Sequence, residues 1–441
     1  MSTNKDILRL AVPSILANIT IPLVGIVDTA IVGHLSDASA IGGIAIGTML
    51  FDLLYWNFGF LRIGTSGLTA QAYGAGQQDE CRRILTRSLT IACIAAFVIW
   101  AIQWLFVTAV LAIVPCSAEV AQVARDYFFV RIWAAIATLM LFTCKGWFIG
   151  MQDTKSPMAV DILVNVINMV ASYYLAVRTP LGVVGVAYGT LVAQYSGLLL
   201  AIMILAFKYK IVHIGIREII ESMKGGEVKR MMALNGNLFI RSMCFMVVYV
   251  GYTFLASRHG DTELAVSSIM MKLFMFFSFF VDGFAYAGEA LVGKAIGQGR
   301  TSVSDIVSRL FVWSIGVGGL FTLIYALWGD DCIQLLTNDV PVLSASEQYM
   351  GWLIAMPMIS TLAFMWDGIY VGATAGVQIR NSMIWAAMAF VLVFMVGEWG
   401  MNYVHMAPLM ALFAAYFAHL LARVVYLSVQ WKQTPLRQQN K

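Results

Sequence analysis

The chain has 441 residues, of which 60% are hydrophobic and only 12% are charged. Soluble proteins usually carry about 25% charged residues, so this chain has half the ordinary share. Twelve membrane spans of about 20 residues would need roughly 240 apolar positions, which the composition can supply. These proportions favour a polytopic membrane protein and exclude a secreted disulfide scaffold, a nucleic-acid reader and an ordinary cytosolic enzyme.

Long apolar runs, taken in chain order, predict twelve membrane-spanning helices and therefore an all-α fold. An outer-membrane barrel is excluded, because its strands would alternate in polarity at every second residue. The spans are expected at 7–33, 39–73, 86–114, 121–150, 157–177, 183–207, 230–257, 263–296, 306–328, 347–373, 382–404 and 408–430.

The net charge of +4 is interpreted as a topology signal. Basic residues gather at the N-terminus and in the even-numbered loops, whereas the odd-numbered loops hold only Arg125, Arg178 and Arg258. Positive charge marks the cytoplasmic side, so both termini are expected in the cytoplasm, with the chain in a bacterial-type inner (plasma) membrane. Arg423 is assigned to that cytoplasmic side together with the C-terminal tail. No nucleic-acid partner is needed to explain the basic residues.

Six cysteines are scattered along the chain without CxxC spacing, as expected for small packing residues. A bridge between Cys116 and Cys332 is the alternative. No cleavable signal peptide is expected, because the sequence from Ile7 onward reads as a complete span without an A-x-A site.

The sequence repeats itself at an offset of 222 to 223 residues. Matching glycines include Gly146 with Gly368 and Gly150 with Gly372. The repeat predicts two six-helix halves, an N-lobe at 1–207 and a C-lobe at 230–441, joined by a basic cytoplasmic linker at 208–229. Because six is an even number, the halves should share one membrane orientation, as in transporters that rock around a central site.

Asp28 is the prime functional candidate in the first half, since an ionisable residue inside a span is costly. A carboxyl group in apolar surroundings could take up a proton from outside and release it later in a transport cycle. A permanent pair with Arg131, or the capping of an unwound turn, is the alternative. Pro13 and Pro22 interrupt the hydrogen bonding of the same helix and are predicted to bend it.

The second half carries more charge within its spans. Arg241, Asp282, Glu289 and Asp367 are expected at depths that would let them meet. Such a cluster is either part of the ion-coupling machinery or a static ion network that holds this half together.

Polar residues of the first half are predicted to form a polar network or part of a substrate cavity. For the amides, hydrogen bonding between helices is the favoured role. The set comprises Asn18, Asn165, Asn168, Ser172 and Gln194.

Motifs for nucleotide binding and metal catalysis are not found in the sequence. The five histidines are dispersed without HExxH spacing, and Gly74-x-Gly76 lacks the ending of a phosphate-binding loop. The chain is therefore expected not to be an enzyme and to use no cofactor and no nucleotide. Uphill transport would draw on an ion gradient.

Several motifs resemble the multidrug and toxic compound extrusion (MATE) family, and the resemblance runs essentially end to end. They are VDTAIVGHL after Pro22, GLTAQAYGAG at 67–76 and FIGMQDTKSPM at 148–158. Three stretches resemble its DinF-like branch: NLFIRS at 237–242, VDGFAYAGEALVG at 281–293 and FMWDGIYVGA at 364–373.

The resemblance implies two pseudo-symmetric six-helix bundles around a V-shaped cavity, acting as a monomer among membrane lipids. It implies export of small amphipathic, often cationic compounds in exchange for protons or sodium ions. The coupling acid of the family matches Asp28, and its bending proline matches Pro13. Members commonly have an acid on helix five where this chain has Ser172. The sodium-coupled branch uses second-lobe acids, so a sodium site at Asp367 and Glu289 stays open.

The sequence therefore predicts a secondary active multidrug exporter that works by alternating access, with proton antiport favoured. Sodium coupling is one alternative. Another is a flippase for a lipid-linked substrate, which should have a more basic cavity for phosphates. An intramembrane enzyme would need a converging nucleophile and base, and the sequence offers no such pair.

Overall fold

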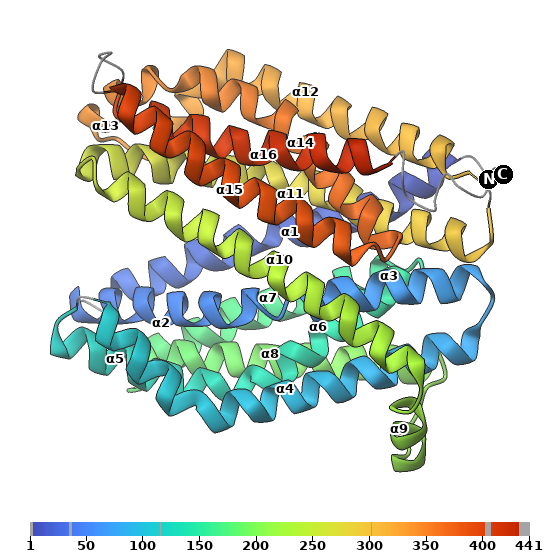
Figure 1. Cartoon of the computed structure of the whole chain (residues 1–441). Helices are drawn as coiled ribbons and strands as arrows, with labels where there is room; N and C mark the ends of the chain where they lie inside the picture. Colours follow the sequence, from blue (N-terminus) through green and yellow to red (C-terminus); the bar gives the residue numbers. More distant parts are fainter. Residues whose placement is uncertain (1–2, 35–37, 115, 301, 402–406, 432–441) are drawn as a thin grey trace. The chain divides into compact units, whose positions relative to one another are not determined.

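The computed structural model describes residues 3–34, 38–114, 116–300, 302–401 and 407–431. Within these ranges the side chains of residues 3, 26, 28–30, 32–34, 38–40 and 401 lie outside the description. Every regular element in the described residues is helical, and twelve helices are long and apolar enough to cross a membrane (Figure 1). The predicted all-α, twelve-span fold is confirmed.

Two compact units make up the chain. The first unit comprises residues 16–73 and 77–232, and the second unit comprises residues 1–15, 74–76 and 233–441. The division falls inside the first helix, between Ile15 and Leu16, so the opening residues of the chain pack with the later half. A Cβ atom on Gly283 would lie only 2.8 Å from the carbonyl oxygen of Ala11, so the two backbones touch in this unit.

The helices of the first half follow the predicted spans with two interruptions. The expected span 121–150 contains a 3₁₀ turn at Ile132–Ala134. The expected span 39–73 is broken at residues 57–59, where the Asn57 side chain donates to the Leu53 carbonyl oxygen at 2.7 Å and Gly59 follows. Asparagine and glycine both favour turns, which explains the break. The elements are α1 (Thr3–His34), α2 (Ala38–Trp56), α3 (Phe60–Gly74), α4 (Gln78–Ile113), α5 (Ala118–Arg131), the 3₁₀ turn η1 (Ile132–Ala134), α6 (Ala135–Gly150), α7 (Lys155–Val177), α8 (Gly182–Phe207) and α9 (Ile216–Ser222).

The second half repeats six long helices and adds the short helix α13. Its third long helix is kinked at Trp328, whose φ and ψ of −131° and 24° are not helical. The elements are α10 (Gly226–Ser257), α11 (Asp261–Gly297), α12 (Ser304–Gln334), α13 (Val340–Glu347), α14 (Met350–Gly372), α15 (Gly376–Met401) and α16 (Met410–Trp431).

Repeat-related glycines make the same close helix crossing in each unit. A Cβ atom on Gly146 of α6 would lie 2.2 Å from the Arg62 carbonyl oxygen of α3. On Gly368 of α14 it would lie 2.4 Å from the Ala285 carbonyl oxygen of α11. Only glycine permits so close an approach of two backbones.

The turns after these crossings match as well. Gln152 and Thr374 are 222 residues apart, and both adopt a left-handed conformation, with φ of 63° and 54°. Non-glycine residues rarely have positive φ, so one unusual turn occurs twice. The sequence repeat is therefore a structural repeat.

All six cysteines are free thiols. The alternative bridge between Cys116 and Cys332 is therefore wrong. Cys81 and Cys144 are buried packing residues, as expected of cysteine in an apolar interior.

Candidate functional site

Polar side chains of the first unit join neighbouring helices. The amide of Asn165 on α7 donates to the Thr20 hydroxyl of α1 at 2.5 Å. The amide of Asn168, one turn further along α7, donates to the Thr190 hydroxyl of α8 at 3.0 Å. These contacts agree with the favoured interhelical role. Asn168 also keeps a buried amide oxygen without a hydrogen-bond partner, so one acceptor is available inside the unit.

Three other polar positions of this unit differ in their surroundings. Asn18 is buried on α1, whereas Gln194 is half-buried on α8. Ser172 on α7 is fully buried, and its hydroxyl donates to the Val186 carbonyl oxygen at 3.5 Å. A Cβ atom on Gly189 would come within 2.4 Å of the Ser172 hydroxyl oxygen, so α8 packs tightly against it. A larger acidic side chain at position 172 would be crowded by that backbone.

Asp28 belongs to α1, but its side chain lies outside the described residues. Its role as the coupling acid therefore stays a prediction. Pro13 and Pro22 both lie inside α1, which is assigned as one helix from Thr3 to His34. The prolines do not end the helix, and their hinge role also stays a prediction.

Arg131 lies at the end of α5 among aromatic rings. Its Nη1 atom donates to the Tyr127 hydroxyl at 2.7 Å, and its guanidinium carbon lies 4.5 Å from the centre of the Phe51 ring. Aromatic faces attract cations, so these rings hold the arginine in place. Asp52, next to Phe51, is an exposed acid on the otherwise uncharged helix α2 and was not among the predicted site residues.

A buried ion triad occupies the second unit. Asp367 of α14 uses its Oδ2 atom to bind Arg241 of α10 at 2.7 Å and Arg423 of α16. Asp367 is 6% exposed and Arg423 is 1% exposed. Arg423 is therefore more than a basic residue at the end of a span, because its guanidinium turns into the helix bundle to meet a carboxylate. Its assignment to the cytoplasmic side stays a prediction. An isolated buried charge would be far more costly than a paired one.

His419 lies on the same helix four residues before Arg423 and is completely buried. Neither of its ring nitrogens has a hydrogen-bond partner, and the Oδ1 atom of Asp367 also lacks one. The five histidines are dispersed along the sequence, and the proximity of His419 to Arg423 was not predicted. The spacing of four was the available signal, because residues four apart share a helix face.

The triad contains two arginines for one aspartate, which makes a sodium ion at Asp367 electrostatically unfavourable. A cation would meet two guanidinium groups that already occupy Oδ2. Among the described residues, no group of three or more His, Cys, Asp or Glu is placed to hold a metal ion. Asp282 and Glu289 lie on α11, and Glu289 is buried. The described ion pairs of Asp367 are with the arginines.

The FIGMQDTKSPM stretch forms a clasp at one end of the first unit. Asp153 follows α6 and accepts hydrogen bonds from Lys208 at 2.6 Å, from the Tyr209 hydroxyl at 2.8 Å and from Ser156. Burial raises the pKa of Asp153, but these three donors outweigh it and bring the pKa below its ordinary value. This part of the family motif therefore ties the start of α7 to the segment after α8.

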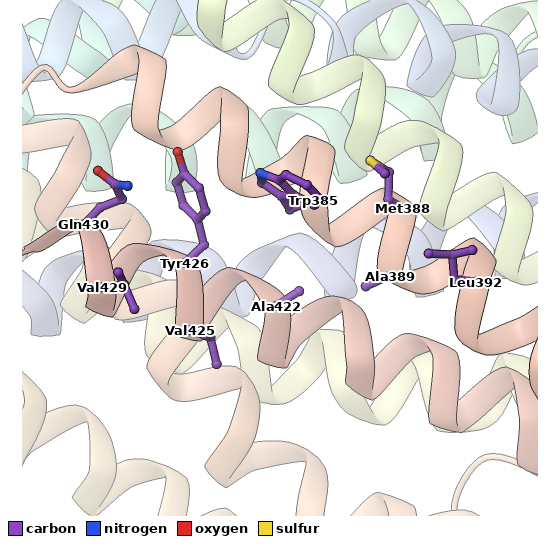
Figure 2. Close-up of a pocket in the computed structure, with 9 residues that line it drawn as sticks. All are labelled: Trp385, Met388, Ala389, Leu392, Ala422, Val425, Tyr426, Val429 and Gln430. Carbon is purple, nitrogen blue, oxygen red and sulfur yellow. The ribbon is translucent and has the colours of Figure 1, made fainter.

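An apolar groove of about 430 Å³ runs between α15 and α16 on the second unit (Figure 2). Its lining is uncharged, with the Tyr426 hydroxyl and the Gln430 amide among its few polar groups. Such a lining suits hydrocarbon and offers nothing for ion coupling, so the triad is the stronger candidate site. The lining residues are Trp385, Met388, Ala389, Leu392, Ala422, Val425, Tyr426, Val429 and Gln430.

Comparisons with known proteins agree with the repeated fold. The MatE family model matches twice, at residues 13–174 and 238–399. The DNA damage-inducible protein F of Escherichia coli (strain K12) is 32% identical over 433 residues, covering 98% of this chain and 93% of that protein. Mouse multidrug and toxin extrusion protein 2 is 26% identical over 382 residues, covering 83% and 64%.

A solved structure described as the outward-facing conformation of a multidrug resistance MATE family transporter has the same fold. Its TM-score is 0.86 at 18% identity, covering 100% of this chain and 97% of that chain. Both halves of the chain thus match a family model, and a relative of 32% identity spans nearly its whole length. The chain belongs to the MatE family and is an integral membrane protein.

Proposed function

We propose that this protein is a secondary active exporter of small amphipathic, often cationic compounds, driven by proton entry. The observation that carries the proposal is the match of both halves to one family whose named relatives include multidrug and toxin extrusion proteins. Export by alternating access requires that substrate and coupling ion bind two conformations with different affinities.

Asp28 is the proton carrier in this proposal. The arrangement of the second unit supports the choice indirectly, because Asp367 is already bound by Arg241 and Arg423 and has little need of another cation. Ser172, at the position where related chains commonly have an acid, cannot supply a second carboxylate. A proton on Asp28 would then change the packing of α1 around Pro13 and Pro22.

The proposal is tested with the full chain in proteoliposomes loaded with a fluorescent organic cation such as ethidium. A pH gradient and a sodium gradient are imposed one at a time. We expect the pH gradient alone to drive export and Asp28→Asn to abolish it. The control is Asp126→Asn, which removes an exposed acid of the same unit that is hydrogen-bonded only to Gln122 in the described contacts.

Two outcomes would contradict this assignment. Export driven by sodium alone would support the sodium-coupled alternative. Undiminished proton-driven export by a correctly folded Asp28→Asn protein would remove Asp28 from the mechanism.

A further inference from the structure

The end of α8 and the segment that follows it expose large apolar side chains. Phe207 is 83% exposed, Val212 76%, Ile216 77% and Ile220 50%. We call these four residues the linker apolar surface. Phe207 is the last residue of the span α8, Val212 follows that span, and Ile216 and Ile220 lie on the short helix α9 between the spans α8 and α10.

Helix α9 is held on the first unit by its polar side. Glu218 accepts two hydrogen bonds from Arg82 of α4, at 2.7 and 2.8 Å. Arg87 of α4 donates to the Ser222 carbonyl oxygen at 2.7 Å. The bidentate arginine–carboxylate contact fixes orientation as well as position.

This attachment turns the apolar side outward. Ile216 and Ile220 are four residues apart and share one helix face, while Glu218 and Ser222 share the face toward α4. A small helix on a water-facing surface would normally do the opposite and bury its isoleucines. In Figure 1, α9 runs across the direction of α4 rather than along it, as a helix lying in a membrane surface would.

The charge around this surface is basic. Residues 208–230 contain six Lys and Arg and three Glu. All three glutamates are paired, Glu218 with Arg82 outside the segment, and Glu221 and Glu227 with Arg217 and Arg230 inside it. Lys210 and Lys224 are exposed on either side of α9. A basic segment with an outward apolar face is typical of helices that bind anionic bilayers.

We propose that the linker apolar surface is a binding site for the anionic phospholipid leaflet on its side of the membrane. The four apolar side chains would enter the boundary between headgroups and acyl chains, and the flanking lysines would contact the phosphates. The site is independent of the proposed transport function, because it rests only on the exposed apolar side chains, the orientation of α9 and the charge of this segment.

The test uses two labelled forms of the full chain, Ile220→Cys and Glu221→Cys, in a background whose native cysteines are replaced. Each carries a fluorophore and is reconstituted in vesicles that contain a lipid with a nitroxide on its acyl chain. We expect quenching of the Ile220→Cys label to be at least about twofold stronger than that of the neighbouring Glu221→Cys label. Phosphatidylglycerol should increase the difference relative to pure phosphatidylcholine, and added salt should reduce that increase.

A second measurement keeps the native cysteines. Hydrogen–deuterium exchange of residues 207–224 in the wild-type protein should be slower in nanodiscs with phosphatidylglycerol than in nanodiscs of phosphatidylcholine. Equal exchange in both lipids, or equal quenching of the two labels, would overturn the proposal. Shielding of the Ile220→Cys label that grows with protein concentration in detergent would instead identify a second copy of the chain as the occupant.

Discussion

Asp367 and Arg423 form a buried ion pair between α14 and α16, and Arg241 binds the same carboxylate oxygen from α10. The triad carries one net positive charge. Its members therefore contribute unequally to stability, since loss of the one acid leaves the buried Arg423 and the half-buried Arg241 without a counter-ion, and loss of one arginine leaves a neutral pair.

Replacing Asp367 should destabilise the protein far more than replacing Arg423. We expect Asp367→Asn to lower the free energy of unfolding by roughly 3–5 kcal/mol, because both guanidinium groups lose their counter-ion. Arg423→Met should cost much less, since Asp367 and Arg241 still neutralise each other. Chemical unfolding in detergent measures both. The control is Asp305→Asn, from an exposed pair with Arg309, which should cost less than about 1 kcal/mol; equal losses at positions 305 and 367 would refute the argument.

Adding one methyl group at a glycine crossing should separate two helices. Gly368→Ala would place a Cβ atom 2.4 Å from the Ala285 carbonyl oxygen, and we expect a loss of about 1–3 kcal/mol in unfolding free energy. Gly319→Ala in α12 is the matched control, because nothing lies within 4 Å of its added Cβ. The control should be neutral or gain up to about 1 kcal/mol from helix propensity. Both variants are measured by thermal unfolding. An equal change in unfolding free energy for the two would contradict the close-crossing explanation.

The clasp at Asp153 predicts a pH-dependent contribution to stability. Its pKa is lowered in the folded protein, so the stabilisation is fully present above the ordinary carboxyl pKa of about 3.9 and is lost as the pH falls through the folded value. We expect Asp153→Asn to cost roughly 1–3 kcal/mol at neutral pH and progressively less in acid. Unfolding measured over a pH series tests this. The control is Glu347→Gln, at an exposed acid, whose difference in unfolding free energy from the wild type should not change with pH. If the loss caused by Asp153→Asn were the same at all pH values, the pKa argument would be contradicted.

Free cysteines predict a simple mass-spectrometric result. Denaturation without reductant, followed by alkylation, should add six alkyl groups to the intact chain, because all six thiols are free. A mass two groups short would indicate a disulfide.

Much of the fold follows from patterns that depend on the bilayer. Long apolar runs locate the spans because a spanning helix must satisfy its own backbone and contact hydrocarbon. The glycine repeat indicated two related halves, and the structure shows that these glycines lie at close helix crossings, where no other residue fits. The break at Asn57 was not foreseen, since a turn of three residues hardly alters the hydropathy of a long span.

The candidate site was only partly predictable for a different reason. Arg241 and Asp367 were recognised because a charge within a span is conspicuous. Arg423 was counted only as a topology marker and His419 only as one of five dispersed histidines, because distance from a helix end does not reveal which way a side chain points. The side-chain direction is set by the packing of α16 against α14. Counting residues from the end of a span carries no information about that packing.

The duplicated glycine crossings also indicate how the chain evolved. Gly150 packs on the Ser66 carbonyl oxygen and Gly372 on that of Glu289, at the same offset as the crossings of Gly146 and Gly368. Descent from one duplicated six-helix ancestor accounts for four glycines serving the same contacts twice. The partner side chains then diverged, with a serine at position 66 and an acid at 289. The two halves thus share their backbone contacts but differ in the chemistry of the side chains beside them.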